Sequence, residues 1–218
     1  MAKAFLIGGT PRVGKTSLTL RFLKEKPILA TSTDAVRYMI RQIIKESDKP
    51  DLFHLGKYTS NDPARQVYLR NHPSEVISIQ NRESAIVWHS VKDLIESNLA
   101  DGFDVLIEGI AVLPEFVKQL TCDYMAVFLG NQSDQHLKTI LHTARKNDTD
   151  WMHNLDDQTI EAFATFNKAF SKYIQNEAGE HGLRYIEIHD DNFEHDIGQA
   201  LKVLLNLRDS NLIHCAKY

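Results

Sequence analysis

The chain has 218 residues, of which 43% are hydrophobic and 25% charged, and its formal net charge is −4. This composition is typical of a globular protein with one sizeable core. It excludes a disordered or strongly basic chain, so no duplex nucleic-acid partner is indicated. No apolar run approaches the roughly 20 residues that a membrane-spanning helix needs, and the N-terminal MAKAFLIGG is too short for a signal peptide. We therefore expect a cytoplasmic protein without a membrane partner.

A short apolar strand, a glycine-rich turn and a helix open the chain. The pattern predicts the strand over residues 3–7 and the helix over 15–24. A second strand is predicted over 27–30, and the sequence TSTD that follows it can cap a helix over about 35–45. This alternation of strands and helices predicts a parallel sheet with helices packed on its faces.

The middle of the chain interrupts this alternation. Residues 47–74 are polar, contain three prolines and show no strong period, so we expect an insertion there rather than sheet. The elements predicted after it are a helix over 77–99, strands over 104–107 and 124–129, helices over 133–146 and 157–177, a strand over 182–188 and a helix over 194–207. The predicted sheet therefore has five strands. Phe163, Phe166, Phe170 and Tyr173 recur at helical spacing, which predicts that they belong to the core.

The turn after the first strand carries a phosphate-binding motif. From Gly9 to Thr16 the sequence matches G-x-x-x-x-G-K-[ST], with a chance expectation on the order of one in a hundred. In such a loop the backbone N–H groups surround phosphate oxygens, Lys15 bridges the β and γ phosphates, and the Thr16 hydroxyl binds Mg²⁺. No N-K-x-D guanine motif is found, which favours ATP over GTP. The residues expected to bind ATP are Gly9, Arg12, Val13, Gly14, Lys15, Thr16 and Ser17.

A binding loop alone does not show that a phosphoryl group is transferred. Transfer needs cations near the γ phosphate, a Mg²⁺ scaffold and an acid on the acceptor side, and ligands of a parallel sheet gather at the carboxyl ends of its strands. Asp34 follows the second strand, with Arg37 three residues later on the same helical face. Asp34 is a candidate general base and Arg37 a candidate ligand of an anionic acceptor. The alternative for Asp34 is a helix N-cap.

A second acid closes the strand DVLIE. Glu108 stands where a carboxylate can hold Mg²⁺ or contact the substrate, and a turn-forming Glu-Gly pair is the structural alternative. Gly109 lets backbone or ligand approach closely. The sequence HDDN at 189–192 follows the last strand and is rich in turn and capping residues, so we expect no chemistry from it.

Three segments, LIGGTPRVGKTSL, ATSTDAVRYMIR and VLIEGIAVLP, resemble the 2-phosphoglycerate kinase-like P-loop kinases, and more distantly the zeta-toxin and chloramphenicol phosphotransferase kinases. They cover roughly the first 50 residues and a stretch near 104–114. The resemblance implies a three-layer α/β P-loop NTPase fold of the nucleoside-kinase kind and an ATP-dependent phosphotransferase with a hydroxyl acceptor. It also implies that Asp34 is the acceptor-side acid, Arg37 a substrate-anion ligand, Glu108 with Gly109 a second acidic site, and Lys15 and Thr16 the phosphate and Mg²⁺ ligands.

The resemblance also divides the chain. It implies one kinase domain over 1–218, with a helical substrate-binding insertion at about 47–100 and a helical lid region at about 133–156. Arg145 is the candidate catalytic arginine of the lid, and a solvated charge at a helix C-terminus is the alternative. Within the insertion, Lys57, Arg65 and Arg70 can bind an anionic acceptor or remain solvated, and Gln80 and Glu83 share one helical turn.

Acceptors of several classes are compatible with the predicted kinase. An anionic metabolite similar to 2-phosphoglycerate is expected, while a nucleoside, a sugar nucleotide or an antibiotic stays open. A nucleotide-dependent regulatory protein that phosphorylates no acceptor is the alternative from another class. The sequence leaves open whether the protein is a monomer or a homodimer.

Overall fold

Five parallel strands form one sheet in the computed structural model, which describes residues 2–53 and 60–206. The strands are β1 (Ala4–Gly9), β2 (Leu29–Ser32), β3 (Val105–Glu108), β4 (Tyr124–Gly130) and β5 (Arg184–Glu187). Their order is β2-β3-β1-β4-β5, and every neighbouring pair is parallel. The predicted five-stranded parallel sheet is confirmed. Because β1 is central, its carboxyl end is where this topology places a ligand crevice.

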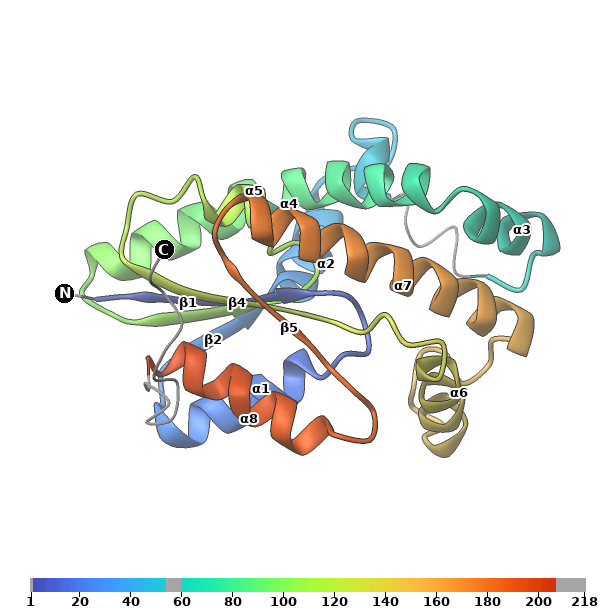
Figure 1. Ribbon diagram of the computed structural model, residues 1–218. Helices are drawn as coiled ribbons and strands as arrows, with labels where there is room; N and C mark the ends of the chain where they lie inside the picture. Colours follow the sequence, from blue (N-terminus) through green and yellow to red (C-terminus); the bar gives the residue numbers. More distant parts are fainter. Residues whose placement is uncertain (1, 54–59, 207–218) are drawn as a thin grey trace.

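Helices cover both faces of the sheet (Figure 1). One face carries α1 (Lys15–Glu25) and α8 (Phe193–Leu204), and the other carries α4 (Pro73–Ala100), α5 (Pro114–Val117) and α7 (Asp157–Glu180). Successive strand residues point to opposite faces, so Phe5 and Ile7 of β1 join the α1/α8 core while Ala4 and Leu6 join the α4/α7 core. The predicted three-layer α/β fold is confirmed.

The insertion predicted over residues 47–74 contains helices. After α2 (Thr33–Ile43) come the 3-10 helix η1 (Pro50–Phe53) and α3 (Pro63–Asn71). The Asp62 side chain accepts the backbone N–H of Ala64 at 2.9 Å and caps α3, and Pro63 occupies the first turn, where a missing N–H costs nothing. Of the nine residues of α3 only Gln66 and Leu69 are buried, so the helix has no apolar stripe that a sequence reading could detect.

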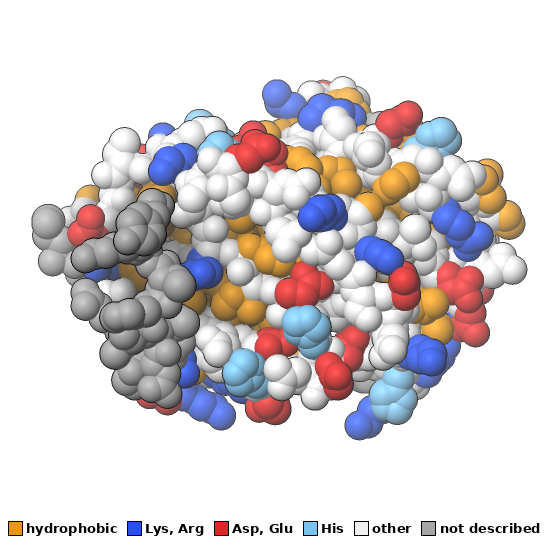
Figure 2. Space-filling model, viewed as in Figure 1, with side chains coloured by type: hydrophobic (Ala, Val, Ile, Leu, Met, Phe, Trp, Pro, Cys, Tyr) orange, Lys and Arg blue, Asp and Glu red, His pale blue; other side chains and the backbone are white. Residues whose placement is uncertain are grey.

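The region expected to form a lid consists of α6 (His136–Lys146) and a segment of turns over 147–156 that leads into α7. On the face shown in Figure 2, acidic and basic side chains are interspersed over α6, α7 and α8. Within 2–53 and 60–206, no helix is both long enough and apolar enough to cross a bilayer.

Candidate active site

A cavity of about 650 Å³ lies at the carboxyl ends of the central strands. Several chain segments that are far apart in the sequence contribute to its wall, among them the loop after β1, helix α2, the end of β3 and the turns that precede α7. Among the predicted site residues, its lining includes Arg12, Gly14, Lys15, Thr16, Ser17, Asp34, Arg37, Glu108 and Gly109. The fold therefore brings the phosphate-loop residues and the strand-end acids to one place.

The loop between β1 and α1 has the backbone shape of an anion site. Arg12 has a φ of 68° and Gly14 a φ of 92°, both in the left-handed region, and α1 begins directly afterwards. No side chain caps the N-terminus of α1, so the N–H groups of its first turn remain available to an anion. A Cβ at Gly14 would lie 2.7 Å from the ring of Phe193. This arrangement fits a phosphate chain.

Lys15 is buried beside this helix start. Its side chain is only 8% exposed, and Nζ donates a hydrogen bond to the backbone oxygen of Thr10 at 2.6 Å. Burial lowers the pKa of Lys15, while the negative charges of Glu108 and Asp34 act in the opposite direction. An anion in the cavity would therefore stabilise the charged form of this side chain.

Two residues of the predicted ATP-binding set, Gly9 and Val13, are required by the packing of the fold. The Val13 side chain is 1% exposed and belongs to the α1/α8 core. A Cβ at Gly9 would lie 2.0 Å from the Leu129 oxygen, so the close packing of β1 on β4 requires glycine there. Neither residue is part of the cavity lining, so the predicted contact with phosphate would involve the backbone alone.

Asp34 stands in the first turn of α2 without capping it. The cap is Ser32, whose Oγ accepts the backbone N–H of Ala35 at 3.1 Å, so the N-cap alternative for Asp34 is wrong. The Asp34 side chain is 54% exposed, and its Oδ1 lies 3.0 Å from a terminal nitrogen of Arg37. A carboxylate at a helix N-terminus is favoured by the helix dipole. Asp34 therefore remains a candidate proton acceptor.

A pair of arginines on α2 forms the next part of the wall. Arg37 and Arg41 lie one turn apart, and both donate to the same carboxylate oxygen of Glu83, at 3.1 and 3.3 Å. Glu83 belongs to α4 and is 1% exposed. This buried carboxylate holds both guanidinium groups in place. The sequence reading missed Arg41, although its spacing of four residues from Arg37 is the signal that could have found it.

Glu108 lies between the phosphate loop and Asp34. In the sheet register it is level with Ile7 of β1 on one side and Ser32 of β2 on the other. Burial raises the pKa of Glu108, the charge of Asp34 adds to this, and Lys15 acts against it. Thr16 and Glu108 both line the cavity, and a hydroxyl with a carboxylate is a donor set that suits Mg²⁺. The two side chains therefore fit the predicted metal site.

Gly109 is required by its neighbour in the fold. Its φ is 143°, and an added Cβ would lie 1.9 Å from the Thr33 Oγ1. We expect Gly109→Ala to lower the free energy of unfolding by about 1–3 kcal/mol, because it adds backbone strain and a steric clash. Urea denaturation measures this, with Gly179→Ala on α7 as the control, since a Cβ there meets nothing within 4 Å. Equal stabilities of the two variants would contradict the prediction.

The raised pKa of Glu108 predicts a dependence of stability on pH. A carboxyl whose pKa is higher in the folded than in the unfolded state destabilises the fold once pH rises through that interval. We expect Glu108→Gln to be more stable than the wild type at pH 7, and the difference to shrink as pH falls below the ordinary glutamate pKa. Denaturant titrations at several pH values measure this, with exposed Glu161→Gln as the control. A less stable Glu108→Gln protein at pH 7 would overturn the prediction.

Arg12 connects the phosphate loop to the segment over 147–156. Its guanidinium forms a two-pronged ion pair with Asp150, in which Nη1 donates to Oδ2 at 2.6 Å. The same group lies 5.6 Å from the ring centre of Trp151. The hydrogen bond from Arg12 lowers the pKa of Asp150, so this carboxylate is ionised over a wide pH range. Asp150 and Trp151 also line the cavity, and the sequence reading missed both.

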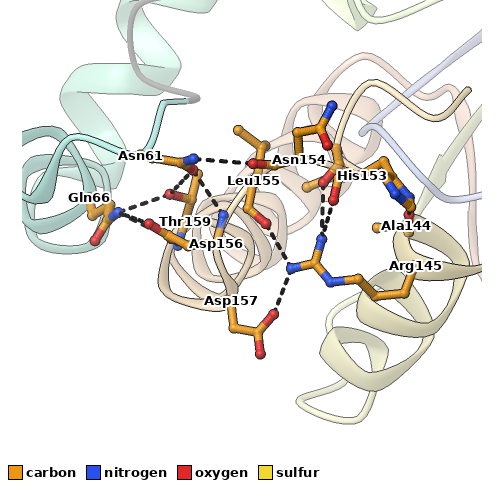
Figure 3. Close-up of polar contacts among 11 residues, drawn as sticks. Asn61, Gln66, Ala144, Arg145, His153, Asn154, Leu155, Asp156, Asp157 and Thr159 are labelled. Atoms are coloured by element: carbon orange, nitrogen blue, oxygen red, sulfur yellow. Dashed lines mark hydrogen bonds and ion pairs between the residues drawn. The ribbon is translucent and has the colours of Figure 1, made fainter. Parts of the chain in front are cut away.

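Arg145 is placed differently from its predicted role. Its guanidinium donates to the backbone oxygens of His153 at 2.6 Å and Leu155 at 2.7 Å, and it pairs with Asp157 at 2.7 Å (Figure 3). Arg145 is not part of the cavity lining, so in this arrangement it holds the turns over 147–156 together. Its catalytic role stays a prediction. Among the described residues, the cations that line the cavity are Arg12, Lys15, Arg37 and Arg41.

Arg65 and Arg70, two candidate cations of the insertion, are not part of the cavity lining. Arg65 pairs with Asp62 at 3.3 Å, and Arg70 contacts the Gln158 oxygen at 3.5 Å. Lys57 lies outside the described residues.

In the HDDN sequence, Asp190 accepts a 2.8 Å hydrogen bond from His136. These contacts give the residues structural partners within the chain.

The central phosphate loop, the sheet order and the strand-end acids define the class: a P-loop protein with the three-layer fold of small-molecule kinases. In sequence the chain resembles archaeal 2-phosphoglycerate kinases. It is 24% identical over 185 residues to that of Methanothermobacter thermautotrophicus, covering 84% of this chain and 59% of the relative. It is 25% identical over 183 residues to that of Thermococcus kodakarensis, covering 84% and 60%. The chain thus spans about 60% of the length of these relatives, and no protein-family model matches it.

Solved structures of small-molecule kinases share the fold. A gluconokinase from Sinorhizobium meliloti aligns with a TM-score of 0.52 at 11% identity, covering 94% of this chain and 93% of its own. A shikimate kinase from Bacteroides thetaiotaomicron aligns with a TM-score of 0.50 at 16% identity, covering 94% and 99%. Both the sequence relatives and these structures are named as kinases, which agrees with the resemblance found in the three sequence motifs.

Proposed function

We propose that the protein is an ATP-dependent kinase that transfers the γ-phosphoryl group of Mg·ATP to a hydroxyl of a small anionic metabolite. The observation that carries this proposal is one cavity lined by Lys15 and Thr16 of the phosphate loop together with Asp34 and Arg37. A nucleotide-binding protein needs only the first pair. The acid and the arginine beside the loop support transfer to an acceptor. The names of the curated relatives make 2-phosphoglycerate the first acceptor to test.

In this mechanism the side chains position two substrates and move one proton. Lys15, Ser17 and the start of α1 bind the triphosphate, and Arg37 binds the anionic group of the acceptor. Mg²⁺ held by Thr16 and Glu108 would neutralise charge on the phosphates. Asp34 accepts the hydroxyl proton while the acceptor oxygen bonds to the γ phosphorus and the bond from that phosphorus to ADP breaks.

The division of the chain belongs to the same proposal. Residues 47–100 would form the acceptor side of one domain over 1–218, which is supported by Gln80 in the cavity wall and by Glu83 behind the two arginines. Residues 133–156 would cover the phosphate loop, which is supported by the contacts of Asp150 and Trp151 with Arg12. We propose a cytoplasmic location, where Mg·ATP is available.

Turnover tests the proposal. Purified protein with Mg·ATP is incubated with 2-phosphoglycerate, 3-phosphoglycerate, nucleosides, sugar nucleotides and aminoglycosides in turn. Formation of ADP and the mass of the phosphorylated product are measured. We expect ADP formation to depend on one class of acceptor. Slow ATP hydrolysis that no acceptor accelerates, together with nucleotide-dependent binding of another protein, would support the regulatory alternative instead.

A further inference from the structure

Arg41 lines the cavity, and the proposed mechanism gives it no role. It lies four residues after Arg37 and seven after Asp34 on α2, so the three side chains share one face of the helix. All three belong to the cavity lining. The side chains of Arg37 and Arg41 are 15% and 18% exposed, so each presents part of its surface to a ligand. Arg41 is therefore placed to contact the same acceptor as Arg37.

Internal contacts hold the Arg41 guanidinium in one orientation. Its Nε donates to the backbone oxygen of Leu52 at 2.8 Å, and its Nη2 donates to the same oxygen and to Glu83. The centre of the Phe53 ring lies 5.2 Å from the guanidinium carbon. Within the described part of the chain, the Arg41 Nη1 has no hydrogen-bond partner. A group that is already ordered loses little conformational entropy when its remaining donor binds a ligand.

The contacts with Glu83 show that the two arginines can share one anion. The Arg37 Nη1 and the Arg41 Nη2 both donate to the Glu83 Oε1, at 3.1 and 3.3 Å. Because the two nitrogens meet on one oxygen, the guanidinium groups lie close enough to bind a second oxyanion together. Arg37 has a further carboxylate, Asp34, at 3.0 Å, whereas the only carboxylate paired with Arg41 among the described residues is the shared one. Arg41 is thus the less compensated charge of the pair.

The electrostatics of Arg41 also favour an anionic partner. Burial lowers the pKa of Arg41, the charge of Glu83 acts against this, and the charge of Arg37 adds to it. An oxyanion beside the guanidinium would offset both unfavourable effects. The structural alternative is that Arg41 only links α2 to η1 through the Leu52 oxygen. Loss of such a link would change stability and leave anion binding unchanged.

We propose that Arg41 is a second anion-binding residue of the acceptor site, which clamps one oxyanion of the acceptor together with Arg37. This inference rests on the proposed kinase function and adds a specificity-determining residue to its acceptor side. A phosphate group carries a charge of about −1.5 to −2 at pH 7 and three terminal oxygens, so it can contact both guanidinium groups at once. A carboxylate has one charge and can be held by one arginine. Arg41 therefore strengthens the binding of a phosphate more than that of a carboxylate.

Two small acceptor analogues test the clamp. Glycerol 2-phosphate and glycerate both have a primary hydroxyl and one anionic group, a phosphate in the first and a carboxylate in the second. Their affinities are measured by calorimetry on the full chain saturated with Mg²⁺ and a non-hydrolysable ATP analogue, which occupies the phosphate loop. We expect Arg41→Met to weaken the binding of glycerol 2-phosphate by roughly tenfold to a hundredfold, the effect of losing a charged hydrogen bond. Glycerate binding should weaken less, so the preference for the phosphate should fall.

Further variants separate binding from folding. Arg41→Lys keeps a positive charge and a donor for Leu52 but lacks the planar fork, so its affinity for glycerol 2-phosphate should lie between those of Arg41→Met and the wild type. Arg184→Met removes the same charge from an exposed residue of β5 outside the cavity lining, and it should leave both affinities unchanged. Because Arg37 and Arg41 hold the same group, the losses from Arg37→Met and Arg41→Met should not add in the double variant.

Three results would overturn the inference. The first is a wild-type protein that does not bind glycerol 2-phosphate. The second is an Arg41→Met protein with unchanged affinities for both analogues, whether or not urea denaturation shows a loss of stability, since Arg41 would then be a structural link alone. The third is an Arg41→Lys protein with the wild-type affinity for glycerol 2-phosphate, a result that can be obtained even if Arg41→Met does not fold.

Turnover of the same proteins separates this inference from the proposed function. ADP formation with 2-phosphoglycerate at a wild-type KM in Arg41→Met would overturn the role of Arg41 and leave the kinase activity standing. Binding of glycerol 2-phosphate that depends on Arg41, without phosphorylation of any acceptor in the panel, would contradict the kinase activity and support the anion clamp.

Discussion

Asp34→Asn is expected to lower kcat for acceptor phosphorylation by roughly 10²- to 10⁴-fold, the range for loss of a general base. The amide keeps the size of the side chain and can still accept a hydrogen bond from Arg37, but it cannot take up the hydroxyl proton. Because Ser32 caps α2, the helix start does not depend on residue 34. Steady-state kinetics measure the loss, and binding of a Mg·ATP analogue should be retained.

The matched control is Asp93→Asn. Asp93 is exposed on α4 and is not part of the cavity lining, so the same chemical change should leave kcat at the wild-type value. Wild-type activity of Asp34→Asn would refute the role of this carboxylate as the base. Loss of both activity and nucleotide binding would place Asp34 in the nucleotide site instead.

Lys15→Met is expected to lower kcat/KM for ATP by about 10²- to 10³-fold, because it removes a fixed positive charge from the place where the γ phosphate gains negative charge. The same change should not reduce stability. Burial lowers the pKa of Lys15, which means that the folded state disfavours the charged form. A neutral side chain of similar length removes that cost. The expected signature is therefore strong loss of activity with an equal or higher free energy of unfolding at pH 7.

Lys24→Met serves as the control, since Lys24 is an exposed residue of the same helix. It should change neither kcat/KM nor stability appreciably. Activity measurements and urea denaturation on the same preparations check both parts. A Lys15→Met protein that is inactive and also strongly destabilised would show that this lysine supports the fold rather than the chemistry.

The sheet could be predicted because its signals are local. β1 is a fully buried apolar run that is followed at once by a glycine-rich turn, so the position of the phosphate loop follows from neighbouring residues. The bounds of α3 could not be predicted, because the contacts that stabilise it are distant in the sequence. Its buried Gln66 donates to Asp156 and Thr159, which are 90 and 93 residues away in the sequence. A helix that buries only one amide and one leucine shows no hydrophobic periodicity in its sequence.

The site residues also fall into those that local sequence signals predict and those that depend on distant contacts. Asp34, Arg37 and Glu108 could be proposed from the sequence because the carboxyl ends of parallel strands meet at one edge. The partner of Arg12 could not, since Asp150 is 138 residues away and lies in a segment without a motif. For Gln80, the sequence predicts only that it shares one helical turn with Glu83. Its place in the cavity wall depends on how α4 packs beside α2, which is tertiary information.

The ion pair of Arg12 with Asp150 also bears on how the loop responds to salt. Asp150 acts as an internal counterion for Arg12, the one arginine of the phosphate loop. Its Oδ2 lies 2.6 Å from the Arg12 Nη1. A phosphate that binds Arg12 exchanges with this carboxylate rather than with dissolved anions. The free energy of replacing a carboxylate that is part of the chain does not depend on salt concentration, whereas the free energy of displacing dissolved anions does. The contribution of Arg12 to phosphate affinity should therefore vary little with ionic strength.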